Sequence, residues 1–289
     1  MADSPEEIVD AALSVLDEHL HLSEVEGPST HIAIHPRALE DESVPEALGR
    51  YFVGLVAGIV QEDVSLGEEL LAIEPDSAAE VRLQINKTIG RDNNFPNKRR
   101  RHFRDRVRNP YIAEVMAHAL MVLRSRGDTA CLLGPPVALK NPHADPRKQG
   151  MDLIGIYDGG GLPAAVIGEA KASRKYGPRR LKEAAKFFAD IEAGKRGVEI
   201  RTELGSLKLA LDRDMRRGIG DGFWRQRCAY VPIIAFEEPI DETKDNGDLD
   251  GLRPDPADIR LIALEISPFY SFFDQVADQI RRATEELLA

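Results

Sequence analysis

Two apolar runs separated by a glycine cluster are the feature that most constrains the fold of this 289-residue chain. Met151–Tyr157 and Ala164–Lys171 each have the composition of a β-strand, and Asp158-Gly159-Gly160-Gly161 lies between them. Because glycine accepts the positive φ angles that tight turns need, the segment predicts a β-hairpin. The register of a hairpin is set by its turn, so this one also predicts which side chains meet at its open end.

The patterns around the hairpin predict a mixed sheet flanked by helices. Asn109-Pro110 is typical of a helix start, and apolar residues then recur at helical spacing as far as Leu123. We expect a strand within 129–139, helices at 178–193 and 202–217, strands at 229–236 and 259–266, and a closing helix at 271–288. This α-β-β-β-α-α-β-β-α order indicates an α/β fold.

The first 97 residues have a different character. Ser4-Pro5-Glu6-Glu7 predicts a helix start, a second helix is expected at 45–61, and 31–34 alternates like a short strand. We therefore divide the chain into an acidic, α-rich segment at 1–97 and a main domain at 98–289.

Charge is distributed unevenly along the chain. The net charge is −11, which by itself argues against a nucleic-acid partner, because such proteins need cations to displace counterions. Residues 1–97 hold 20 acidic and 5 basic residues, 98–236 hold 15 and 28, and 237–289 hold 14 and 5. The middle block is thus strongly basic, and the net charge does not exclude a nucleic-acid enzyme.

Other features indicate the class of protein. No apolar run reaches the ~18 residues that span a bilayer, and the acidic start is unlike a signal peptide. Two cysteines are too few for a disulfide framework. We expect a cytoplasmic protein with no membrane span.

Three polar residues stand where the hairpin strands should be apolar. Asp152 begins the first strand, and Glu169 and Lys171, two apart and so on one face, end the second. Folding the hairpin brings the three together, and a bound cation would compensate the cost of burying them. Carboxylate and carbonyl oxygens suit Mg²⁺ or Mn²⁺. The alternative is an ordinary ion pair on an edge strand.

This arrangement resembles the PD-(D/E)XK nuclease superfamily. The match consists of Met151-Asp152 on one strand and Glu169-Ala170-Lys171 on the next, inside an α-β-β-β-α-β order that spans about residues 109 to 236. Met151 stands where the eponymous proline would be. The resemblance implies a restriction-endonuclease-like fold in which Asp152, Glu169 and the carbonyl of Ala170 hold the metal and Lys171 is the catalytic lysine.

The resemblance also implies a glutamate on the helix before the hairpin. Glu114 is the candidate, but it points away from the apolar stripe of its helix, toward either the cleft or solvent. Size and layout are similar to the nuclease subunit of Hachiman-type antiviral systems, which implies a helicase partner. The chain itself has no Gly-x-x-x-x-Gly-Lys-Ser/Thr loop for ATP.

Basic residues cluster on both sides of the hairpin. The run Lys98–Arg108 holds seven bases, one acid and Phe103, and a second group follows Lys171. The candidates for nucleic-acid contacts are Arg99, Arg100, Arg101, Arg104, Arg174, Lys175 and Lys182. The alternatives are a solvated helix edge or a strip that docks on the acidic N-terminal segment.

These observations favour a Mg²⁺-dependent nuclease that hydrolyses DNA phosphodiester bonds and works with a helicase in antiviral defence. The rival interpretation is a non-catalytic nucleic-acid-binding or assembly module built on a nuclease-like fold.

Overall fold

The structure is a computed structural model that describes residues 5–25, 28–59, 78–126, 136–142, 150–159, 162–220, 222–238, 240–241, 244 and 246–287. Parts of five predicted features lie outside these ranges: Ser4, residues 60–61 of the 45–61 helix, the start of the 129–139 strand, Gly160-Gly161, and residue 288 of the 271–288 helix. Every candidate site residue lies inside them.

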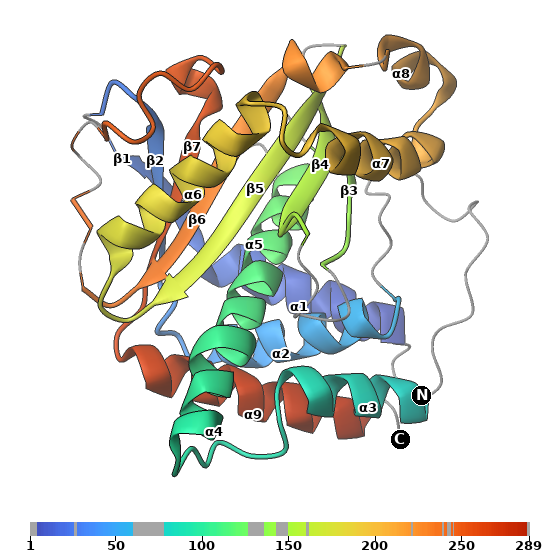
Figure 1. Cartoon of the computed structure of the whole chain (residues 1–289). Helices are drawn as coiled ribbons and strands as arrows, with labels where there is room; N and C mark the ends of the chain where they lie inside the picture. Colours follow the sequence, from blue (N-terminus) through green and yellow to red (C-terminus); the bar gives the residue numbers. More distant parts are fainter. Residues whose placement is uncertain are drawn as a thin grey trace.

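The described strands form one seven-stranded mixed sheet in the order β1-β2-β7-β6-β5-β4-β3 (Figure 1). Four neighbouring strands, β2, β7, β6 and β5, run parallel, and β1, β4 and β3 are antiparallel to their neighbours. The strands are β1 (His21–Val25), β2 (Ile32–Arg37), β3 (Pro136–Leu139), β4 (Leu153–Asp158), β5 (Pro163–Ser173), β6 (Cys228–Phe236) and β7 (Arg260–Glu265).

The predicted hairpin is β4 and β5, and its two strands differ in length. β4 pairs with β5 only from Asp158 opposite Pro163 to Leu153 opposite Gly168. On its other side, β5 stays paired with β6 as far as Ser173. The last five residues of β5 therefore have an open edge on the side where β4 has not yet begun.

Helices cover both faces of the sheet. One face packs on α1 (Pro5–His19), α2 (Ser43–Val56), α3 (Ala78–Thr88), α5 (Asn109–Arg126) and α9 (Phe269–Leu287). The other face packs on α6 (Gly177–Glu192) and α7 (Gly197–Leu207). The side chains of β5 alternate between these two cores: Ala164, Val166 and Ala170 face the first core, and Ala165 and Ile167 face the second.

Shorter helices connect these elements. α4 (Lys98–Phe103) continues through a π-helical turn, η1 (Arg104–Arg108), into α5. The remaining short elements are η2 (Lys208–Ala210), α8 (Arg213–Gly218), η3 (Phe223–Arg225) and η4 (Pro256–Asp258).

The predicted α/β class and the order of the main elements from residue 109 onward are confirmed. The single helix expected at 202–217 is wrong, because the chain forms α7, the short turn η2 and then α8. Leu211 is extended, and the Asp212 side chain accepts hydrogen bonds at 2.8 Å from the amides of Asp214 and Met215. This N-cap starts a new helix where the apolar spacing suggested continuity.

The acidic first part of the chain contributes to the same sheet and core. β2 pairs with β7, and α2 lies against α9 so closely that a Cβ on Gly49 would be 2.7 Å from the backbone carbon of Gln279. As a domain boundary, residue 97 stays a prediction, although elements on both sides of it share one sheet. Within the described ranges, no helix is both long and apolar enough to cross a membrane.

Candidate active site

The three polar hairpin residues come together at the open edge of β5. Lys171 Nζ contacts Glu169 Oε1 directly and lies 3.8 Å from Asp152 Oδ2. The Glu169 side chain is only 10 % exposed, and those of Asp152 and Lys171 are 18 % and 27 % exposed. The predicted convergence of Asp152, Glu169 and Lys171 is therefore present in the structure, and it is more buried than an ordinary surface ion pair.

The backbone of β5 explains how Asp152 is placed. Asp152 Oδ2 accepts a hydrogen bond from the backbone amide of Ala170 at 2.9 Å. Ala170 lies beyond the last residue of β5 that pairs with β4, so Asp152 takes the position that a strand partner would otherwise fill. In an extended strand the N–H and C=O of one residue point to the same side, so the carbonyl of Ala170 also faces this edge.

Glu114 approaches the cluster from α5. Among residues 111–120 it is the one side chain that is only partly buried. It lies close enough to Asp152, Glu169 and Lys171 for their charges to affect its pKa. Of the two directions that the helical pattern left open, the structure places Glu114 toward the candidate site. Four ionisable groups from α5, β5 and the start of β4 thus meet at one edge.

Burial and mutual repulsion disturb the ionisation of the carboxyl groups. Burial raises the pKa of Glu169 to about 8, with a further contribution from the charge of Asp152 and opposition from Lys171. Burial and then the charge of Asp152 hold the pKa of Glu114 well above its usual range. Burial also raises the pKa of Asp152, although Lys171 and the Ala170 amide offset part of the effect. Three carboxyl groups therefore lie near a single ammonium group, that of Lys171.

Lys171 responds in the opposite sense. Burial alone would lower its pKa, but the charges of Glu169 and Asp152 outweigh burial and raise the pKa above the usual value. Lys171 is therefore a cation at neutral pH and a hydrogen-bond donor, not a base.

The sequence pattern did not indicate one further cation near the site. Burial raises the pKa of Asp152 and of Glu169, and the charge of Arg196, in the turn between α6 and α7, offsets a small part of that rise. Its guanidinium donates to Glu199 at 3.0 Å and lies 4.6 Å from the centre of the Phe187 ring. Only the basic pair Lys195-Arg196 marks it in the sequence, and nothing there relates it to a hairpin 25 residues away.

The cluster offers oxygen donors of the kind that bind a divalent cation. Glu169 Oε2 is buried and has no hydrogen-bond partner within the described part of the chain. The oxygens of Asp152, the Ala170 carbonyl and this orphan oxygen are hard ligands of the type that Mg²⁺ prefers. No cluster of three or more His, Cys, Asp or Glu side chains in the described ranges is already arranged around a metal position. The oxygen donors suit such an ion chemically. One oxygen of Glu169 is already in contact with Lys171, so Oε2 is the oxygen left for a metal.

Some basic candidates of α4 and η1 are exposed, and others already form ion pairs with acidic side chains. Arg99 and Arg101 are exposed. Arg100 pairs with Asp92 at 2.5 Å, and the Arg104 guanidinium pairs with Asp105 at 2.8 Å and lies 3.7 Å from the centre of the Tyr270 ring.

The last arginine of the basic run serves the fold. Arg108 is fully buried and donates to Asp274 of α9 at 2.6 Å and to Asn93 at 2.8 Å. It is therefore not part of the exposed basic surface.

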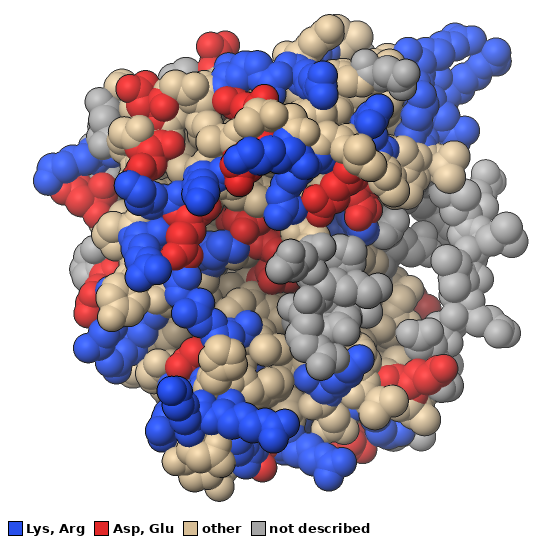
Figure 2. Space-filling view, in the orientation of Figure 1, with Lys and Arg blue, Asp and Glu red and all other residues tan. Residues whose placement is uncertain are grey.

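A cleft of about 250 Å³ opens directly after Lys171. It is bounded by the end of β5, the start of α6, η1 and the start of α9. Its lining includes four basic side chains and two tyrosines: Arg106, Arg174, Lys175, Arg180, Tyr176 and Tyr270. Figure 2 shows Lys and Arg over α4 and beside the tip of β5, interspersed with acidic residues.

The remaining candidates lie on this side of the molecule or further along α6. Arg174 approaches Glu237 at 3.7 Å, and Lys175 is exposed. Lys182 does not line the cleft; it is exposed on α6 and lies 3.5 Å from Asp248.

Comparison with known proteins does not assign the site. No protein-family model matches the chain, and the search of curated proteins found no significant similarity.

Proposed function

We propose that this protein is a divalent-metal-dependent nuclease that hydrolyses DNA phosphodiester bonds at the edge of β5. The observation that carries the proposal is the buried cluster of Asp152, Glu169, Glu114 and Lys171. When ionised, the cluster holds two more negative than positive charges. Burying such an excess is costly, and a divalent cation supplies the missing charge.

Asp152, Glu169 and the Ala170 carbonyl would hold the ion, with Glu114 close enough to contribute through its charge. When bound, Mg²⁺ would lower the pKa of a coordinated water and stabilise charge that develops on a phosphate oxygen. The resemblance to PD-(D/E)XK nucleases supports the same assignment of ligands.

The chain's own residues prepare the reaction. Asp152 accepts the Ala170 amide at the open edge of β5, and this hydrogen bond holds its carboxylate on the same edge as Glu169. Lys171, held between Glu169 and Asp152, presents an ammonium group that can donate to a phosphate oxygen and orient the attacking water. Because its raised pKa keeps it protonated, we assign Lys171 a positioning and electrostatic role instead of that of general base.

The cleft beyond Lys171 supports a polyanionic substrate. Arg106, Arg174 and Lys175 line it and would bind the phosphates of the strand that passes through the site. Tyr176 is 58 % exposed at its rim and offers a ring on which a base could stack. Arg99 and Arg101 on α4 would extend the same path.

Without a recognisable ATP-binding loop, translocation along DNA would come from another protein. The similarity of layout to the nuclease subunit of Hachiman-type systems supports a helicase in that role and a place in antiviral defence. A non-catalytic nucleic-acid-binding or assembly module is the alternative, and the intact set of Asp152, Glu169 and Lys171 speaks against it.

The test is cleavage of supercoiled and linear DNA by the full chain in Mg²⁺, Mn²⁺ or EDTA, alone and with a helicase encoded nearby. We expect metal-dependent cleavage that Glu169→Gln and Lys171→Met abolish and that Arg217→Gln, on the distant α8, leaves unchanged. Binding of the same DNA is measured in parallel. Binding without cleavage under every condition would establish the non-catalytic alternative, and cleavage that survives Glu169→Gln would refute the site.

A further inference from the structure

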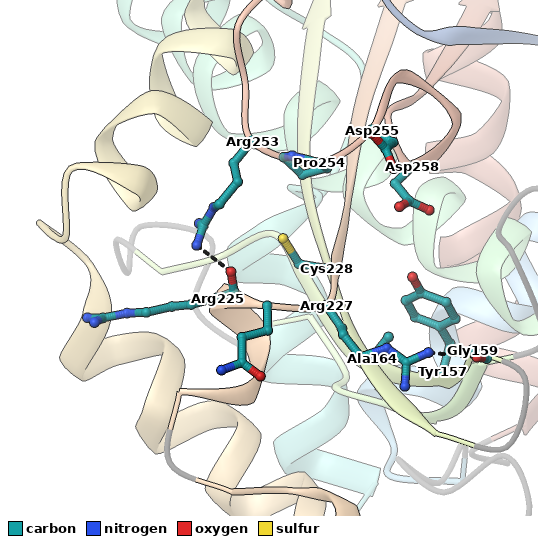
Figure 3. A pocket seen from close by; sticks show the side chains of 11 residues that line it. Tyr157, Gly159, Ala164, Arg225, Arg227, Cys228, Arg253, Pro254, Asp255 and Asp258 are labelled. Atoms are coloured by element: carbon teal, nitrogen blue, oxygen red, sulfur yellow. Dashed lines mark hydrogen bonds between the residues drawn. The ribbon is translucent and has the colours of Figure 1, made fainter.

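A second cavity lies at the other end of the sheet, where β4 ends and β5 and β6 begin (Figure 3). Its volume is about 490 Å³, within the range of roughly 300–1,000 Å³ typical of small-molecule sites. Four separate segments line it: Tyr157 and Gly159, Ala164, Arg225–Cys228, and Arg253–Asp255 with Asp258. None of the candidate active-site residues takes part.

Two arginines at this cavity are held by backbone carbonyls. Arg227 Nη2 donates to the carbonyl of Gly159 at 2.7 Å, and Arg253 Nη1 donates to the carbonyl of Arg225 at 2.5 Å. A carbonyl fixes a guanidinium without cancelling its charge, and each group has further N–H donors. Arg253 is also 3.9 Å from Glu192, whereas the Arg225 side chain extends away from the cavity in Figure 3. The geometry leaves Arg227 and Arg253 able to bind an anion.

The wall across the cavity from Arg253 offers an acceptor. Asp258 Oδ1 is buried and has no hydrogen-bond partner among the described residues. Burial, followed by the charge of Asp255, raises the pKa of Asp258. In Figure 3 its carboxyl group and the Tyr157 hydroxyl point toward one another across the cavity. A buried acceptor without a donor is costly in free energy, so a ligand that brings an N–H or O–H here would relieve that cost.

Chemistry on the protein itself is not favoured. Burial raises the pKa of the Cys228 thiol to about 11, so the thiol stays protonated and is a poor nucleophile. Burial raises the pKa of Tyr157 to about 12, which keeps its hydroxyl neutral. The cavity therefore presents a binding surface with Arg253 on one side and, on the other, the Asp258 acceptor together with Arg227 and Tyr157.

We propose that this cavity is a binding site for a mononucleotide, with the phosphate on Arg253 and a sugar hydroxyl or base amino group on Asp258. A bare phosphate would use only an arginine and leave Asp258 Oδ1 without a donor. A mononucleotide supplies both the anion and the donors, and the cavity volume admits it.

The site is separate from the candidate active site. Tyr157 and Ala164 line the cavity, and Asp152 and Glu169 lie five residues further along the same two strands. At about 3.3 Å per residue the two sites are roughly 16 Å apart along β5. Binding here neither requires nor blocks the nuclease activity proposed above, so each proposal can fail alone.

The chain offers an internal reporter for the test. Trp224 is the single tryptophan, and it directly precedes Arg225, whose carbonyl accepts from Arg253 at the cavity. Titration of the full chain with AMP, dAMP or inorganic phosphate in EDTA is followed by Trp224 fluorescence and by calorimetry. We expect saturable one-to-one binding of AMP or dAMP, at least tenfold tighter than that of phosphate.

Substitutions locate the binding. Asp258→Leu is similar in size, removes the acceptor and should weaken mononucleotide binding about tenfold. Arg253→Gln should have a similar effect, whereas Arg217→Gln on α8 and Glu169→Gln should not change it. Arg253→Gln carries the test if Asp258→Leu fails to fold. The proposal is overturned if neither mononucleotide binds saturably or if phosphate binds equally well. It is also overturned if the folded Asp258→Leu or Arg253→Gln leaves the affinity unchanged or Glu169→Gln abolishes binding.

Discussion

The Asp152 carboxylate accepts the backbone amide of Ala170 at 2.9 Å, across the gap that β4 leaves beside β5. One side chain thus completes the edge of the strand and stands beside Lys171, 3.8 Å away. The hydrogen bond belongs to the fold, and the proposed function gives the same carboxylate a second role as a metal ligand.

These two roles of Asp152 can be separated by substitution. Asp152→Asn retains an oxygen that can accept the Ala170 amide but removes the charge, whereas Asp152→Ala removes both. We expect both variants to lose at least about 100-fold in DNA cleavage, because a neutral side chain is a poor metal ligand. Only Asp152→Ala should also lose about 1 kcal/mol in the free energy of unfolding. Activity in Asp152→Asn close to that of the parent protein would contradict the assignment.

The raised pKa of Glu169 predicts how the metal-free protein responds to pH. Between the ordinary value of 4.5 and the folded value of about 8, the folded state holds a proton that the unfolded state has released. The stability contributed by Glu169 is therefore complete below pH 4.5 and is lost as pH rises through about 8. Denaturant titrations in EDTA should show this decline.

Glu169→Gln and Mg²⁺ provide the controls for that decline. Glu169→Gln removes the titrating group and should flatten the pH dependence. Saturating Mg²⁺ should restore stability at pH 8 in the parent protein but not in Glu169→Gln, because a bound ion stabilises the folded state by mass action. A pH profile that is the same in both proteins would show that Glu169 does not carry the buried charge.

The cleft beyond Lys171 predicts a salt dependence. If Arg174 and Lys175 contact phosphates, changing each to Gln should weaken DNA binding at low salt for every sequence. It should also reduce the slope of log K against log salt by about one per residue. Fluorescence anisotropy with a labelled duplex measures both quantities. Arg217→Gln, which removes an exposed charge on α8, is the matched control, and an equal effect there would indicate general electrostatic attraction.

The core of the helical layer predicts acid sensitivity. His118 is fully buried on α5, its Nδ1 lies 2.7 Å from the Tyr51 hydroxyl, and burial lowers its pKa to about 3. Its contribution to stability is present above the ordinary pKa of 6.5 and is lost as pH falls toward 3, because only the unfolded chain takes up the proton.

Acid unfolding followed by circular dichroism measures this effect. We expect the free energy of unfolding to fall less between pH 7 and acid pH in His118→Gln than in the parent protein. After allowance for its stability at pH 7, the variant should therefore unfold at a lower pH. His102→Gln changes an exposed histidine of α4 and should leave the midpoint unchanged. Equal acid midpoints in the parent and His118→Gln would contradict the prediction.

The hairpin shows how much of this site local sequence can predict. Asp152, Glu169 and Lys171 lie within 20 residues of one another, and a turn with fixed register suffices to bring them together. Helical spacing placed Glu114 on the side away from its apolar stripe. It could not say that this side faces the edge of β5, because that depends on how α5 crosses the sheet.

Features built from distant segments were not predictable in this way. Arg108 belongs by sequence to a basic run, yet Asp274, 166 residues later, draws it into the core. Arg196 reaches the site from a turn between two helices. The cavity around Arg227 and Asp258 likewise needs loops that only the parallel order of β5, β6 and β7 brings together. Local pattern determines strands and helices, whereas long-range packing decides which charges become neighbours.

The pairing of β2 with β7 limits how this protein can be shortened for experiments. An expression fragment that began at residue 98, where the charge changes sign, would leave the edge of β7 without a partner and uncover the apolar side of α9 that α2 covers. Exposed strand edges and apolar helix faces promote aggregation. A fragment limited to the basic region would thus be prone to aggregation, and the acidic segment belongs in every vector designed to measure its activity.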